Sequence, residues 1–312
     1  MEALVRLILQ SGKSGLDLAL YILLPVLLVM MAVMKVIEAR GILAMVARWL
    51  RPLLRVFGIP GAGAFAILQL LLVSFAAPLA TLAIMEKDST SRREIAATLA
   101  MVLTMSQANV VFPMVAVGLN IGVIMLTSLI GGLAAAALTY YWFARSTGDG
   151  HVDGGFVANA NRDTRSSTMN LLIAGGQEAV QVILGAIPIL ILAIFLVNIL
   201  KETGGISLLE RVLSPLMGRI GFPVVAVLPL ATKYLAGGTA MMGVTLNLLK
   251  EGAITTQELN RMAGFLTNPC DLVGVAVLIS AGSRCASVVR PAIGGAVVGI
   301  LVRGVLHLLI FR

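Results

Sequence analysis

The sequence predicts an all-α integral membrane protein with two inverted repeats. Each repeat is expected to contain a helix, an amphipathic helix, a re-entrant hairpin, a broken helix and a final helix. Hydrophobic residues form 59% of the chain and charged residues 12%, about half the charged share of a soluble domain. Apolar runs at 18–36, 122–143, 180–200 and 291–311 have the length that a membrane helix needs. The chain also repeats itself.

The repeat is clearest where residues 25–60 and 188–223 align without a gap, at an offset of 163 residues. Of these 36 positions, 9 are identical, and five of the nine are glycine or proline. Glycine and proline determine the course of the backbone rather than its hydrophobicity, so the match is one of architecture. Internal duplication in an apolar chain is typical of transporters whose two halves share a central site.

The first two elements of each repeat are a membrane helix, at about 17–37 and about 178–200, and then an amphipathic helix. The amphipathic helices, at 41–58 and 204–221, begin and end at glycine and contain one proline each. Arginines alternate with apolar residues along the first of them. Helices of this kind lie in the headgroup plane of a bilayer rather than crossing it.

The third element is an apolar segment broken near its middle, at 60–85 and 223–249. The first is interrupted by Ser74 and Pro78, and the second by Lys233 and the small residues at 236–239. Each segment is either one kinked spanning helix or two short helices that form a re-entrant hairpin. Irregular backbone at membrane depth occurs only where protein or a water-filled cavity satisfies it, which favours a functional break.

The fourth element begins with a capping box, at 91–94 and at 255–258, and runs to a polar break at 104–109 and 267–271. A last membrane helix closes each repeat. The chain therefore divides into an N-terminal segment (1–16), a first membrane repeat (17–144), a polar linker (145–168) and a second membrane repeat (169–312).

The distribution of basic residues favours the hairpin interpretation and an inverted second repeat. With hairpins, 13 basic residues lie on the side of the first amphipathic helix and 9 on the other side, with Lys233 at a hairpin tip. If the broken segments span the membrane instead, the basic residues divide almost evenly between its two sides. The excess of basic residues in cytoplasmic loops places the first amphipathic helix in the cytoplasm.

The net charge of +8 is assigned to membrane surfaces rather than to nucleic acid, because aromatic residues that could stack on bases form only 5% of the chain. No catalytic constellation is present, so we expect no enzyme activity and no cofactor. Cys270 and Cys285 have no metal-ligand spacing.

Two charged residues, Lys233 and Asp271, are expected near the midplane of the membrane. They either pair with each other or serve the transported species, with Asp271 exchanging H⁺ or Na⁺ and Lys233 meeting an anion. Helix N-terminal donors after the tip would support an anion. The candidate substrate-binding residues are Ser74, Ser106, Gln107, Asn109, Lys233, Gly238, Thr239, Thr267, Asn268 and Asp271.

Four features of the sequence resemble those of a known family. They are the order of the parts, the Gly-bounded amphipathic helices ending at 57–60 and 220–223, the tip at 77–79 and the two polar breaks. The chain is similar to bacterial membrane proteins with a nucleoside-recognition (Gate) domain, related to the transport core of concentrative nucleoside transporters and to spore maturation proteins A and B. The resemblance covers about 20–310. The nucleoside transporters carry a Gly-Gln-Thr/Ser-Glu run before the proline of the first tip, whereas residues 73–77 here contain neither Gln nor Glu.

The expected function is secondary transport of a small solute, nucleoside-like or a small organic anion, by alternating access at a midplane site between two hairpins and two broken helices. Coupling to Na⁺ or H⁺ is expected. One alternative is a non-transporting membrane subunit that docks a partner. Another is a ferrous-iron permease that uses Cys270. The expected partners are the lipid bilayer, a small-molecule substrate and a second copy of the chain, and the expected location is the bacterial inner membrane.

Overall fold

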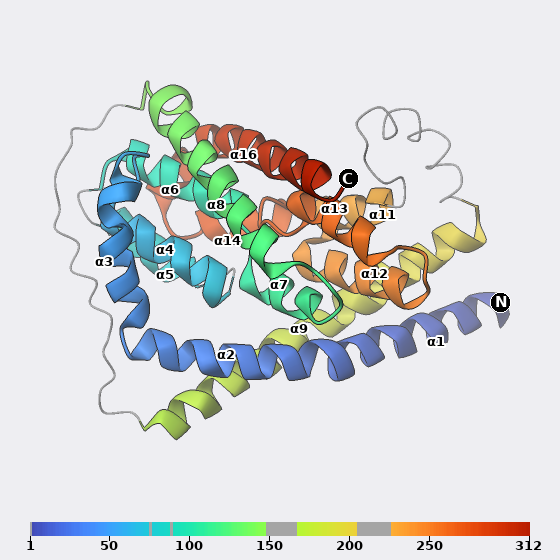
Figure 1. The fold of residues 1–312 in the computed structure, drawn as a ribbon. Helices are drawn as coiled ribbons and strands as arrows, with labels where there is room; N and C mark the ends of the chain where they lie inside the picture. The colour runs from blue at the N-terminus through green and yellow to red at the C-terminus, as the bar shows by residue number, and fades with distance from the viewer. Residues whose placement is uncertain (1, 75–76, 88–89, 148–166, 205–225) are drawn as a thin grey trace.

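The computed structural model describes the chain except for residues 1, 75–76, 88–89, 148–166 and 205–225, and every regular element in the described part is helical (Figure 1). The second amphipathic helix and most of the linker lie outside the described residues. The elements of the first repeat are α1 (Glu2–Asp17), η1 (Leu18–Leu23), α2 (Leu24–Ala39), α3 (Ile42–Arg55), α4 (Gly61–Leu72), α5 (Pro78–Lys87), α6 (Arg92–Thr104), α7 (Ala108–Val115), α8 (Ile121–Leu138) and η2 (Thr139–Phe143). Those of the second are α9 (Thr168–Glu202), α11 (Val227–Ala236), α12 (Gly238–Lys250), α13 (Thr256–Leu266), α14 (Leu272–Ile279), α15 (Ser283–Ser287) and α16 (Val289–Ile310).

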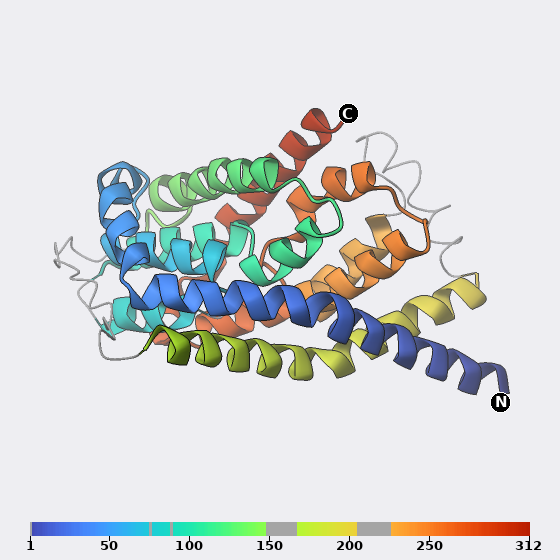
Figure 2. The ribbon, with the colours of Figure 1, turned by 60° about the horizontal axis from the view of Figure 1, so that its bottom comes forward.

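In the described residues, the spanning helices, hairpins and broken helices of the two repeats correspond, in inverted orientation. Adding 163 to the bounds of α6 and α7 gives 255–267 and 271–278, within one residue of α13 and α14 at each end. The chain from α1 to α2 packs along its counterpart α9 and runs in the opposite direction, and α8 and α16 are paired in the same way (Figures 1 and 2). The predicted fold class is therefore confirmed.

The membrane-spanning helices agree with the predicted spans. In the described part of the chain, five helices are long and apolar enough to cross a membrane: Leu4–Ala39, Arg92–Val115, Ile121–Phe143, Thr168–Leu196 and Val289–Ile310. The sixth expected crossing is the broken pair α13 and α14, whose halves have 11 and 8 residues. The first helix begins at Glu2, so the predicted N-terminal segment is continuous with it. There Asn198 Nδ2 donates to Ser11 Oγ at 2.9 Å, which ties α1 to α9.

The broken apolar segments are hairpins. Helix α4 packs on α5, and α11 packs on α12. These helices contain 10 to 13 residues, which is about 15–20 Å at 1.5 Å per residue and too short for a hydrocarbon core of about 30 Å. Gly237, with φ at 89°, makes the turn of the second hairpin in a conformation that other residues rarely adopt.

The second half of each broken helix packs in the apolar core that contains the hairpin of the other repeat. The first core holds α7 with the second hairpin, as Val110 and Met241 show. The second core holds α14 with the first hairpin, as Leu278 and Leu68 show. Each broken helix thus begins beside its own repeat and ends against the hairpin of the other, which brings the two breaks together at the centre.

Helix α3 presents an apolar face to the outside. Met45, Trp49, Leu53 and Val56 are exposed, whereas Leu43 and Leu54 are buried against the second core. A helix that buries one face in protein and exposes tryptophan on another is typical of the membrane interface.

The pairing of α8 with α16 depends on glycine. A Cβ at Gly299 would lie 2.5 Å from the carbonyl oxygen of Gly131, so backbone would have to move. We expect Gly299→Ala to lower the free energy of unfolding by about 1–3 kcal/mol, as overpacking of a tight core does, in a thermal melt of the detergent-purified protein. Gly294→Ala is the control in the same helix, because its nearest contact would be an ordinary 3.6 Å to Phe143. Equal melting temperatures for the two variants would contradict this packing.

Candidate functional site at the crossing of the broken helices

The two helix breaks bond directly to each other. The backbone N–H of Gln107 donates to the carbonyl of Thr267 at 3.0 Å. The Gln107 side-chain Nε2 donates to the carbonyl of Asn268 at 3.1 Å. Backbone groups that each helix loses at its break are therefore satisfied by the other repeat, as buried polar groups require.

A cluster of buried hydroxyl groups lies at the same crossing. Ser106 Oγ lies 2.8 Å from Thr267 Oγ1. Ser128 of α8 donates its hydroxyl to Ser106 Oγ at 2.7 Å and accepts from the Ser106 N–H at 3.2 Å. All three side chains have no exposed surface, and Ser106 and Thr267 come from different repeats, as the sequence predicted.

Arg303 of α16 reaches this cluster and is completely buried. Its Nη2 donates to Ser106 Oγ at 2.6 Å and to Thr267 Oγ1 at 2.8 Å, and its Nη1 donates to the carbonyl of Thr104 at the end of α6. Its Nε has no hydrogen-bond partner. Among the residues the structure describes, no carboxylate pairs with Arg303.

Sequence reasoning missed Arg303, Ser128 and the neighbouring His307. His307, also on α16, donates from Nδ1 to the carbonyl of Asn260 at 2.6 Å, and its Nε2 lies 2.9 Å from Thr127 Oγ1. A lone arginine within the apolar run 291–311 was the signal for Arg303. In the count of basic residues on the two sides of the membrane, Arg303 was one of the nine on the outer side. Because Arg303 is buried inside the protein, eight basic residues remain on that side.

The ion pair of Lys233 and Asp271 forms a second polar centre beside the first. Lys233 Nζ donates to Asp271 Oδ2, and the two side chains are 0% and 3% exposed. Asp271 Oδ1 also accepts from the N–H of Gly274 at 2.7 Å, so Asp271 is the N-cap of α14. The pair links the second hairpin to the second break.

The tip of the second hairpin also contacts the first break. A Cβ at Gly238 would lie 2.5 Å from Gln107 Nε2, so the absence of a side chain there permits the contact. Asn268 stabilises its own break, since its Oδ1 accepts from the N–H of Cys270 at 3.0 Å. Asn109 is buried in the first turn of α7. Thr239 is partly exposed in the first turn of α12.

The described contacts do not connect Ser74 with either break. It is buried at the tip of the first hairpin, next to residues outside the described part. A separate polar chain lies in that hairpin instead. Thr81 Oγ1 donates to Gln69 Oε1 at 2.7 Å, and Gln69 Nε2 donates to Glu38 Oε1 at 2.9 Å. Sequence reasoning did not single out Gln69 or Glu38.

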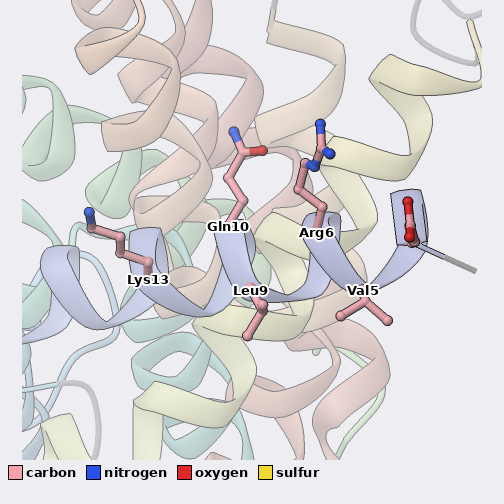
Figure 3. A pocket seen from close by; sticks show the side chains of 6 residues that line it. Val5, Arg6, Leu9, Gln10 and Lys13 are labelled. Carbon is pink, nitrogen blue, oxygen red and sulfur yellow. The ribbon is translucent and has the colours of Figure 1, made fainter.

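Among the described residues, no group of three His, Cys, Asp or Glu side chains could hold a metal ion. The described residues therefore offer no ligand set for the ferrous-iron alternative. The pocket in Figure 3 also lies apart from the crossing. It follows one face of α1 and is lined by Glu2, Val5, Arg6, Leu9, Gln10 and Lys13. None of these residues belongs to the predicted site.

Comparisons with known proteins agree with the repeat. A family model described as Gate, nucleoside recognition, matches residues 20–125 and again residues 183–288, which are offset by the same 163 positions. A structure of doubly substituted CNTnw in an outward-facing state aligns with 99% of this chain and 83% of its own, with a TM-score of 0.69 and 16% identity. CNTnw in an inward-facing, substrate-bound state gives the same coverage, a TM-score of 0.67 and 18% identity.

These solved structures are of a concentrative nucleoside transporter, and at such identities the likeness concerns the fold. A substituted CNTnw in an intermediate state aligns with 93% of this chain and 75% of its own, with a TM-score of 0.71 and 18% identity. A comparison with curated proteins finds no match.

Proposed function

Since the chain belongs to the Gate family of nucleoside-recognition membrane proteins, we propose that it is a secondary transporter that moves a small solute by alternating access. The solute is nucleoside-like or a small organic anion, and an ion gradient drives its movement. The proposed working unit is a homodimer in a bacterial inner membrane with α3 on the cytoplasmic side.

The observation that carries the proposal is the convergence of polar groups at the crossing. Polar side chains deep in a membrane protein are costly, and they usually mark a pathway or a site. Here two broken helices and a hairpin tip place buried hydroxyl, amide and charged groups together, with the ion pair of Lys233 and Asp271 beside them. Transporters with inverted repeats bind solutes where broken helices meet near the midplane.

The roles of the residues follow from their contacts. Gln107 bonds to the break of the other repeat through the carbonyl of Asn268 in this state, so solute entry would exchange that bond for bonds to the solute. Lys233 would meet an acceptor or anionic group, with N-terminal donors of α12 at Gly238 and Thr239. Asp271 would carry H⁺ or Na⁺. Ser74, Ser106, Asn109 and Thr267 complete the proposed binding set.

The test is a thermal-shift screen of the detergent-purified protein, followed by uptake into proteoliposomes. Nucleosides, nucleobases, organic anions, amino acids and ferrous iron are screened in sodium and in choline buffer. A true solute at 100 times its dissociation constant raises the free energy of unfolding by about 2.7 kcal/mol, and the same compound should accumulate in vesicles. If a well-folded protein responds to none of them and takes up none, the partner-docking alternative is favoured.

A further inference from the structure

We propose that the Arg303 guanidinium is a built-in cation that holds the crossing of the broken helices as a bound Na⁺ would, so that the protein needs no sodium ion there. The place of the guanidinium at the crossing is a property of the fold alone. Its consequence, that solute transport does not depend on Na⁺ at the first break, rests on the proposed function.

The guanidinium lies at the end of α6. The last carbonyls of a helix lack partners within it, and they carry the partial negative charge of the helix dipole. Thr104 is the last residue of α6, and its carbonyl accepts from Arg303 Nη1. In transporters with broken helices, such exposed carbonyls and C-terminal half-helix ends coordinate the driving cation. Arg303 places its own positive charge at such an end.

The ligands that surround this charge are neutral oxygens of the kind that a hard cation takes. They are one backbone carbonyl and two hydroxyl oxygens, at 2.6 Å for Ser106 and 2.8 Å for Thr267. No carboxylate of the described residues neutralises the charge, so helix carbonyls and hydroxyl dipoles stabilise a single positive charge. Because the acceptors come from both repeats, the cation joins them.

Neighbouring helices leave space for the stem of the arginine. A Cβ at Gly131 of α8 would collide with Arg303 Cγ. A Cβ at Gly264 of α13 would lie 2.7 Å from the carbonyl oxygen of Arg303. Gly131 therefore leaves room for the arginine side chain, and Gly264 lets α13 lie close to the backbone of α16 at Arg303. The side chain reaches the crossing without exposed surface.

The internal repeat does not supply a second arginine of this kind. Subtracting 163 from 303 gives position 140, which is Tyr140 and not a cation. The second break has Lys233, paired with Asp271, as its buried cation. Each break therefore has one buried cation from the protein, Arg303 at the first break and Lys233 at the second. The internal repeat does not relate these two residues.

The experiment replaces the arginine and asks whether small cations take its place. Thermal melts of the detergent-purified protein compare sodium, potassium, choline and methylguanidinium chloride at equal ionic strength. In the Lys233→Met, Asp271→Asn double variant, which lacks the other proposed cation carrier, the melting temperature should be the same in sodium and potassium. Arg303→Ala should melt several degrees lower in choline and recover at least half of the loss in millimolar methylguanidinium or in sodium, but not in potassium. Arg290→Ala, at an exposed arginine of the same helix, should show neither the loss nor the recovery.

Two results would overturn the proposal. One is a sodium-specific rise in the melting temperature of the Lys233→Met, Asp271→Asn double variant. The other is an Arg303→Ala protein that folds but recovers in neither methylguanidinium nor sodium, which would make Arg303 a packing residue only. If Arg303→Ala does not fold, the double variant with and without Arg303→Lys decides, since Lys restores a charge and should keep the protein insensitive to sodium. These melts require no solute, so a failed uptake screen would not change what they show.

Discussion

Asp271→Asn is expected to destabilise the folded protein by about 3–5 kcal/mol, because it leaves the ammonium of Lys233 buried without a counter-charge. Asn can still accept from the N–H of Gly274, so the cap of α14 survives and the loss reports the charge alone. Lys233→Met should cost a similar amount, since it leaves the Asp271 carboxylate unpaired at 3% exposure. Unfolding of the detergent-purified variants measures both losses.

The double variant Lys233→Met with Asp271→Asn should recover most of the stability, because both buried charges are then absent. Lys35 and Glu178 provide the matched control pair, at 2.8 Å with side chains 37% and 40% exposed. Lys35→Met should change the free energy of unfolding by about 1 kcal/mol or less. Single losses at Lys233 and Asp271 no larger than the loss at Lys35 would show that the central pair is solvated rather than buried.

The same double variant is expected to fold but to lose at least about thirtyfold in uptake of whichever solute the screen identifies. A buried charged contact contributes about 2 kcal/mol or more to binding, and 1.4 kcal/mol corresponds to a factor of ten. Lys35→Met with Glu178→Gln serves as the transport control and should keep its uptake. Stability measured in parallel separates lost transport from lost fold.

Unchanged uptake in the double variant would remove Lys233 and Asp271 from the proposed site. A docking subunit behaves differently from a transporter in this experiment. Its partner binding would tolerate the double variant and would instead be sensitive at Arg48, Arg51 and Arg55 of α3.

The positions of the helix breaks could be predicted from the sequence, but the contacts between the residues at the breaks could not. Proline, glycine and polar residues inside apolar runs have few explanations in a membrane, so the hairpins and the breaks at Ser106 and Thr267 could be predicted. The pairing of Lys233 with Asp271 depends on how a hairpin packs on a broken helix, and two interpretations of these residues stayed open. Their contact is now established, and their role in transport stays a prediction.

Arg303 shows why the rest could not be predicted. A single arginine seven residues before the end of a membrane helix usually extends its charged group to the headgroups. Here Gly131 on the neighbouring helix α8 leaves room for the stem to point inward, and no local pattern around Arg303 contains that information. Ser128 was missed for a similar reason, because one serine within an apolar helix has no distinguishing spacing. Ser74 was predicted from its place at a tip, but the described contacts join it to neither break.

The exchange of half-helices between the two cores has a consequence for biogenesis. Helix α7 packs with the second hairpin, which is synthesised more than a hundred residues later. When the first repeat leaves the ribosome, α7 and the carbonyl of Thr104 therefore lack their final neighbours. The carbonyl of Thr104 gains its contact with the guanidinium only after α16 has been made. The crossing is thus completed only after both repeats have been made, and chains truncated before Arg303 should be substrates for membrane quality control.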